Sequence, residues 1–198
     1  MAKRKEITEP IPTEPLRLDL GCGPNKRTGF VGVDSIAFPG VDVVTDLRGP
    51  WPWKDGTVAE VHCSHFVEHL TAIERVHFVN ELQRVLMPSR KVNGVNVEGF
   101  ATIICPHWAS CRAYGDPTHQ WPPVSEFWFY YLSKEWRATN APHTDAANMP
   151  GGFACDFEAS WGYSVHPQIQ ARSQDAQQFA FAFYKEAIQD LMATLTKK

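Results

Sequence analysis

The stretch Leu16-Arg17-Leu18-Asp19-Leu20-Gly21-Cys22-Gly23-Pro24 runs from alternating apolar residues into an acid and a glycine turn. A second apolar stretch follows closely, Phe30-Val31-Gly32-Val33-Asp34, and it also ends in an acid. This layout predicts a strand, a turn that lets the backbone approach a ligand, and a second strand whose last carboxylate can hold a ribose. In a dinucleotide site the acid lies about twenty residues beyond the glycines. Asp34 follows Gly21 too closely for that, so NAD is disfavoured.

The string LDLGCGPNKRTGFVGVD resembles the first motif and second strand of class I S-adenosylmethionine (SAM)-dependent methyltransferases, especially the small ones that share D-x-G-C-G. For this chain of 198 residues the resemblance implies a Rossmann-like α/β fold with a mostly parallel seven-stranded sheet and an antiparallel last strand. It also implies SAM as the cofactor and methyl transfer as the reaction. The resemblance covers residues 16–105 and weakens beyond them.

The resemblance assigns roles to individual residues. The turn Gly21-Cys22-Gly23 would pass beneath the methionine part of SAM, with Asp19 near its ammonium group. Asp34 would hold the ribose, while Asp46 and the amide of Leu47 would lie at the adenine. Without the resemblance, these residues mark structural turns only, and that alternative stays open. The full set of predicted cofactor-binding residues is Asp19, Gly21, Cys22, Gly23, Asp34, Ser35, Asp46, Leu47, Ser64 and His65.

The segment His65-Phe66-Val67-Glu68-His69 matches the H-x-x-E-H pattern of certain zinc peptidases. Two histidines one helical turn apart can bind zinc, and the glutamate can activate water. Three observations weigh against a metal: the segment directly follows a predicted strand, the glycine motif already commits the sheet to SAM, and no third ligand stands at a telling spacing. We therefore predict no metal, and expect Glu68 and His69 to fix a short helix.

The segment Tyr114-Gly115-Asp116-Pro117-Thr118-His119 resembles a D-P-x-H element that follows the fifth strand in some of these enzymes. A histidine that titrates near neutrality can take a proton from an attacking oxygen or nitrogen. His119 and Asp116 are therefore candidate catalytic residues, and His107 is a second candidate base. The alternative, that Asp116 and His119 only pin a loop by hydrogen bonds, carries equal weight.

Short apolar runs alternate with helical segments along the rest of the chain, which favours a parallel sheet covered by helices. Phe179, Phe181 and Phe183 recur at the two-residue period of a strand, and we expect the last strand there. Ile188, Leu191, Met192 and Leu195 recur at helical spacing and predict a C-terminal helix. Further strands are predicted at 41–45, 58–64, 100–105 and 154–165, a helix from the capping box Thr71–Glu74 to near Pro88, and a hairpin at 92–95.

The composition indicates one methyltransferase-like domain over 15–198, preceded by a flexible tail over 1–14 and carrying an aromatic-rich cap over about 107–150 after the fifth strand. Five cysteines without a CxxC pair argue against a disulfide framework and a structural zinc site. No stretch is long and apolar enough to span a membrane, so a cytoplasmic location is expected.

The acceptor of the methyl group is not readable from the motifs. No (D/N/S)-P-P-(Y/F/W) element follows the fourth strand, and Cys105-Pro106 replaces the Pro-Cys of C5-cytosine enzymes, so a small molecule, sugar or peptide group is the first expectation. Two alternatives remain: a non-catalytic binding or structural protein with this fold, and a nucleic-acid methyltransferase. The nucleic-acid alternative is motivated by three cations, Arg84, Arg90 and Lys91, but a net charge of −3 does not favour nucleic acid.

Overall fold

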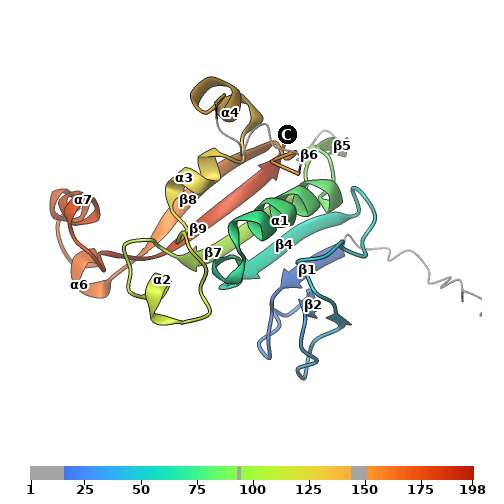
Figure 1. Ribbon diagram of the computed structural model, residues 1–198, viewed down its shortest axis with the longest axis horizontal. Coiled ribbons are helices and arrows are strands. Elements are labelled where there is room, and N and C mark those ends of the chain that lie inside the picture. Colours follow the sequence, from blue (N-terminus) through green and yellow to red (C-terminus); the bar gives the residue numbers. More distant parts are fainter. Residues whose placement is uncertain (1–15, 93–94, 144–150) are drawn as a thin grey trace, which may run out of the picture.

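The computed structural model describes residues 16–92, 95–143 and 151–198. A seven-stranded sheet in the order β3-β2-β1-β4-β7-β9-β8 forms its centre (Figure 1). The neighbours from β3 to β7 pair in parallel, and β9 is antiparallel to both β7 and β8. The predicted α/β fold with its antiparallel last strand is confirmed. The strands are β1 Leu16–Leu20, β2 Val31–Asp34, β3 Val43–Val44, β4 Val58–Ser64, β7 Phe100–Pro106, β8 Phe157–Val165 and β9 Ile188–Lys197.

One face of the sheet is apolar because the strands alternate at a period of two. Leu20, Cys63, Ile103 and Ala193 pair across four neighbouring strands, and all four are fully buried. Helix α1 (Ala72–Val85) packs on this face and contributes its own fully buried apolar residues to the core. The predicted capping box of α1 is present, since the Thr71 side chain accepts from Glu74 N and the Glu74 carboxylate accepts from Thr71 N.

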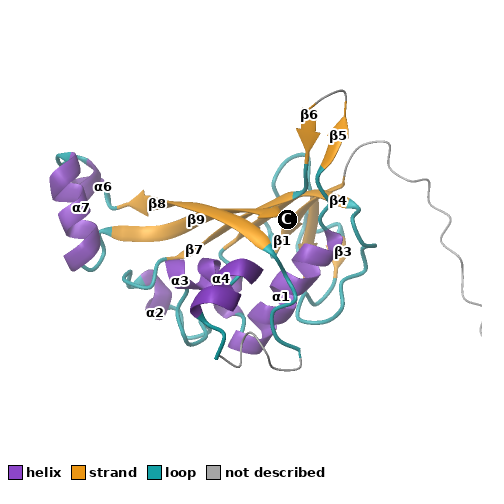
Figure 2. Ribbon diagram, turned by 90° about the horizontal axis from the view of Figure 1, so that it is seen from above, coloured by secondary structure: helices purple, strands orange, loops and turns teal. Residues whose placement is uncertain are grey.

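The opposite face of the sheet is polar. Asp19, His62, Thr102, Thr194 and Ser160 pair across five neighbouring strands, one position before or after the apolar row. Helices α1 to α4 all lie on the apolar side in Figure 2, so the helical cover expected for the sheet is one-sided in the described residues. The turns after β1 and β2 are too short to hold the helices that would cover the polar face.

Two predictions near the C-terminus are wrong. Residues 179–183 lie in helix α7 (Gln174–Phe183), not in a strand. Ser173 caps this helix, and the rings of Phe179 and Phe183, one turn apart, contact each other with centroids 4.8 Å apart. The predicted C-terminal helix is strand β9. Its buried residues include Leu191, Ala193 and Leu195, whereas Met192 is 46% exposed. The helical spacing counted Met192 as core and passed over Ala193, which hid the two-residue period.

In the described part of the segment between β7 and β8 there are three short helices: α2 (Arg112–Gly115), α3 (Glu126–Tyr130) and α4 (Lys134–Asn140). Its aromatic side chains pack on one another and on β8, as in the stacked pair of Phe129 and Trp161. A 3₁₀ turn, η1 (Val67–His69), follows β4, and a short helix α6 (Pro167–Gln170) precedes α7. The domain bounds stay a prediction, since the tail over 1–14 and the end of the cap lie outside the described residues.

The predicted hairpin is present as β5 (Arg90–Val92) paired antiparallel with β6 (Val95–Val97), while its turn at 93–94 lies outside the described residues. All five cysteines are free thiols. Within the described ranges, no helix combines the length and the apolar character needed to cross a membrane.

Candidate functional site

The turn after β1 is held in a shape that glycine permits. Gly21 and Gly23 have φ values of +68° and +53°, a region that residues with a Cβ rarely adopt. The amides of Gly21 and Cys22 both donate to the carbonyl of Val33, at 2.8 and 3.2 Å. A Cβ on Gly21 would lie 2.6 Å from the Phe66 ring. The turn is therefore hydrogen-bonded to the end of β2 and packs closely against the segment after β4.

Asp34 ends β2 at the position predicted for a ribose ligand. Its Oδ2 accepts from Gly23 N at 2.9 Å, and its Oδ1 accepts from Ile36 N at 2.9 Å. A carboxylate offers about four lone-pair positions, so these two bonds leave room for two hydroxyl donors. Asp34 also lines a cavity of about 210 Å³ together with Ser35, Asp46 and Leu47, so four predicted cofactor-binding residues share it.

A second cavity, of about 370 Å³, lies against the glycine turn itself. Asp19, Gly21, Cys22 and Ser64 line it, which makes four more predicted cofactor-binding residues. Asp19 is 4% exposed and both of its oxygens are bonded: Oδ2 accepts from Arg27 N at 2.7 Å, and Oδ1 lies 2.9 Å from His62 Nδ1. Asp19 therefore holds the turn closed and forms part of the cavity wall.

Two predicted residues line neither cavity. Gly23 serves the turn through its amide. His65 directly follows β4 with φ +54°, a strained backbone for a residue with a side chain, and its Nδ1 lies 3.2 Å from Glu68 Oε1. The hydrogen bond that His65 donates to the Glu68 carboxylate raises the pKa of His65. Sequence reasoning missed Phe66 as a cavity residue, although its place two residues after the end of β4 is a signal that was available.

The surroundings of two cavity residues, Asp46 and Cys22, shift the pKa values of their side chains. Arg48 binds the Asp46 carboxylate through Nε and Nη2, each at 2.9 Å, and this hydrogen-bonded pairing holds the pKa of Asp46 below its usual range. An adenine at Asp46 would share the carboxylate with Arg48. Burial, together with the charges of Asp19 and Asp34, raises the pKa of Cys22, so its thiol stays protonated at neutral pH.

His107 is poorly suited to take a proton. It is 2% exposed, its Nδ1 accepts from Ala109 N at 3.3 Å, and its Nε2 lies 3.1 Å from Glu126 Oε1. Because Nδ1 accepts, Nε2 carries the proton and donates to Glu126. Neutral His107 therefore has no free lone pair, and it ties α3 to the end of β7.

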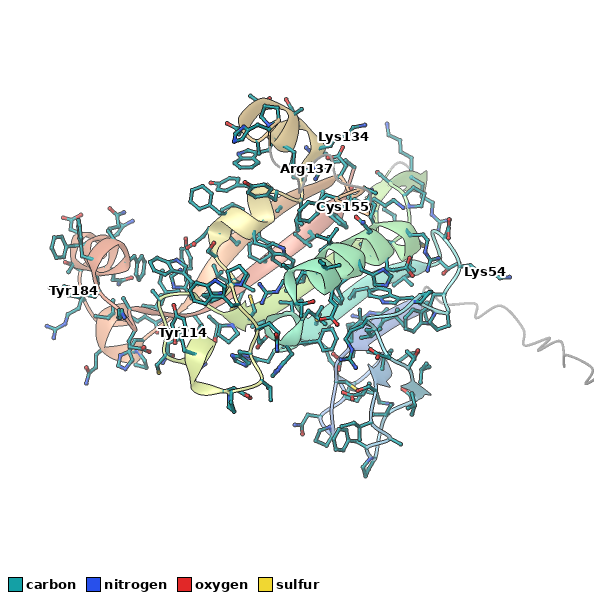
Figure 3. All side chains as sticks on the ribbon, viewed as in Figure 1. Lys54, Tyr114, Lys134, Arg137, Cys155 and Tyr184 are labelled. Atoms are coloured by element: carbon teal, nitrogen blue, oxygen red, sulfur yellow. The ribbon has the colours of Figure 1, made fainter. Side chains whose placement is uncertain are left out.

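His119 and Asp116 lie on the loop after α2, beside a cavity of about 260 Å³. Tyr114, labelled in Figure 3, also lines this cavity. The His119 side chain is 10% exposed, its Nδ1 lies 3.3 Å from Ala113 O, and its Nε2 lies 4.0 Å from Asp116 Oδ2. The carbonyl can only accept, so Nδ1 donates and Nε2 keeps its lone pair. A role for His119 as a base stays a prediction.

No protein-family model and no curated protein matches this sequence. Solved structures share its fold. A SAM-dependent methyltransferase from Archaeoglobus fulgidus superposes with a TM-score of 0.62 at 17% identity, covering 95% of this chain and 88% of the other. A geranyl diphosphate C-methyltransferase from Streptomyces coelicolor A3(2) superposes with a TM-score of 0.51 at 13% identity, covering 93% of this chain and 74% of the other. The chain thus has the fold of class I SAM-dependent methyltransferases.

Proposed function

We propose that this protein binds SAM at the glycine turn and transfers its methyl group to a small-molecule, sugar or peptide acceptor. One observation carries the proposal. The two cavities beside the turn, of about 210 and 370 Å³, each take four of their lining residues from the predicted cofactor-binding set. Ligands of open α/β sheets bind at the carboxyl ends of the strands, where these residues gather.

The residues present fit the chemical groups of SAM. Asp34 keeps free acceptor positions for the two ribose hydroxyls, while Leu47 and Phe66 give the same cavity an apolar surface suited to adenine. Gly21 lines the second cavity with backbone atoms alone. When bound, SAM supplies an electrophilic methyl group on a sulfonium. The protein's part is to orient the acceptor in line with that methyl group and to exclude water.

The acceptor side of the proposal rests on the cap. The cavity of about 260 Å³ beside His119 is lined by Tyr114 and Trp121 among others, and both rings are well exposed. Exposed aromatic faces suit the apolar face of a sugar or another small planar group. The nucleic-acid alternative is weakened because Arg84, one of its three cations, is ion-paired to Glu81 and Asp55 at 2.7 and 2.8 Å.

Methyl transfer from radiolabelled SAM into a host cell extract tests this function. The extract is separated into small molecules, polypeptides and nucleic acids after incubation with the protein or with its Asp34→Asn variant. We expect label in the small-molecule or polypeptide fraction, and much less of it with the variant. Label in the nucleic-acid fraction alone would favour the nucleic-acid alternative. SAM binding without any transfer would leave the non-catalytic alternative.

A further inference from the structure

Glu68, His69 and His119 bring one carboxylate and two imidazoles together, with ligand atoms that all lie within 4.8 Å of one another. Glu68 and His69 come from η1, and His119 comes from the loop after α2. The first two belong to the H-x-x-E-H segment, for which the sequence offered no third ligand at a telling spacing. The folded cap brings His119 to this place as a third candidate ligand, which removes one of the three observations against a metal.

The tautomer of His69 is fixed by its neighbour Thr118. Thr118 Oγ1 donates its single proton to Asp116 Oδ1 at 2.7 Å, because a carboxylate can only accept. The same Oγ1 lies 2.9 Å from His69 Nδ1, so it must accept there. Nδ1 of His69 therefore carries the proton, and Nε2 of the neutral ring presents a lone pair.

His119 is held in the same way. Its Nδ1 donates to the carbonyl of Ala113, which leaves the Nε2 lone pair available. Metal-binding histidines almost always donate their other ring N–H to a carbonyl, a carboxylate or another fixed acceptor, which sets the tautomer and aims the ring. Both rings of this cluster have that arrangement, and they lie edge to face with centroids 4.7 Å apart.

Glu68 gives a second, independent indication of a cation. The residue is 4% exposed, and its Oε2 is buried without a hydrogen-bond partner among the described residues, while Oε1 lies 3.2 Å from His65 Nδ1. Buried carboxylate oxygens are normally bonded, because leaving one unpaired is unfavourable. The backbone is fixed as well, since Gln120 N donates to Glu68 O at 2.8 Å and locks the cap loop onto η1.

We propose that Glu68, His69 and His119 bind one divalent transition-metal ion, for which Zn²⁺ is the first probe. Two imidazole nitrogens and one carboxylate oxygen form one of the ligand sets of three-ligand zinc sites, which keep an open fourth position. Asp116, with Oδ2 4.0 Å from His119 Nε2, adds negative charge beside it. The proposal does not depend on methyl transfer. A bound ion takes the lone pair of His119 that a general base would need.

The location of the site defines what its open position can reach. His69 lines the cavity that contains Asp34, and His119 lines the cavity beside the cap, so the cluster borders both. An ion there would present its open position to an oxygen donor in either cavity, such as a hydroxyl or a phosphate. It would also clamp the cap loop to η1.

Titration of the chelator-treated, buffer-exchanged protein tests the proposal. Calorimetry with Zn²⁺ alone, and the visible absorption of Co²⁺ in its place, report the stoichiometry and the ligand field without any need for activity. We expect one ion per chain, with binding lost in His69→Ala and in His119→Ala. Thr118→Val, which removes the acceptor that fixes His69, is expected to weaken binding about 10–100-fold.

The matched control is His143→Ala, which removes an exposed histidine of the loop after α4 and should leave zinc binding unchanged. Circular dichroism establishes that each variant is folded. Where an alanine variant does not fold, Glu68→Gln replaces it, since it keeps the size of the side chain and should lower the affinity at least about tenfold. A folded wild-type protein without a saturable zinc site overturns the proposal. One-to-one zinc binding that is retained in both His69→Ala and His119→Ala, or in Glu68→Gln, also overturns the proposal.

Discussion

Replacing Gly21 by alanine adds one atom where the structure has no space for it. The new Cβ would lie 2.6, 2.8 and 2.9 Å from Cδ2, Cγ and Cβ of Phe66. The clash includes Phe66 Cβ, which is fixed to the backbone and cannot swing away, and the Phe66 ring contacts the buried Phe78 ring with centroids 5.8 Å apart. The backbone φ of +68° adds strain of its own. Both effects act on the folded state, so Gly21→Ala should lower the free energy of unfolding.

The expected magnitude follows from these two contributions. The left-handed backbone conformation costs about 1–2 kcal/mol for a residue with a Cβ, and overpacking against a side chain costs about 1–3 kcal/mol. The sum for Gly21→Ala is about 2–5 kcal/mol. Gly23→Ala is the matched control: its φ is +53°, and its added Cβ meets nothing within 4 Å. The control should lose only the conformational part, about 1–2 kcal/mol.

Urea denaturation of the wild type and the two variants, followed by circular dichroism, measures both losses. Because Phe66 also lines the cavity that contains Asp34, Gly21→Ala should weaken SAM binding more than Gly23→Ala does. Equal losses of stability in the two variants would refute the packing argument. The turn would then owe its glycines to backbone conformation alone.

Three further predictions concern the cofactor, the pH and the cap. Asp34→Asn removes the charge that would hold the ribose, so calorimetry should show SAM affinity about 10–100-fold lower; an unchanged affinity would contradict the assignment. The hydrogen bond from Arg84 holds the pKa of Glu81 below its usual 4.5. Glu81→Gln should therefore have a lower free energy of unfolding than the wild type at neutral pH, and this difference should vanish as the pH falls through the folded pKa of Glu81. A difference independent of pH would argue against this pair. His107→Ala should destabilise the fold by about 1–3 kcal/mol, because it leaves the half-buried Glu126 without its His107 partner. The SAM affinity should stay unchanged. An unchanged stability would contradict the role of His107 in holding α3 at the end of β7.

The positions of the strand-end residues in the candidate site could be predicted because these residues are close in sequence. Gly21 and Asp34 stand at the ends of successive strands, and parallel strands place their carboxyl ends at one edge of the sheet. The same local logic located β4, whose predicted bounds Val58–Ser64 are the observed ones. Short-range patterns are therefore sufficient for this half of the fold.

The remainder depends on contacts that the sequence does not display. His119 lies near His69 only because the cap folds back onto η1, and no spacing signals that contact. Helix α7 and strand β9 were exchanged because short apolar runs fit both periods, and exposed Phe183 and Met192 satisfied a pattern without being buried. In the described residues the helices cover only one face of the sheet because the turns after β1 and β2 are short. The lengths of these turns can be estimated from the sequence, but the prediction of helical cover did not take them into account.

Calorimetric titration of the wild-type protein with SAM and with S-adenosylhomocysteine tests the central claim most directly. If the two cavities beside the Gly21 turn form the cofactor site, both ligands should bind one to one, with affinity reduced in Asp34→Asn. No detectable binding at millimolar ligand to the folded protein would contradict the account.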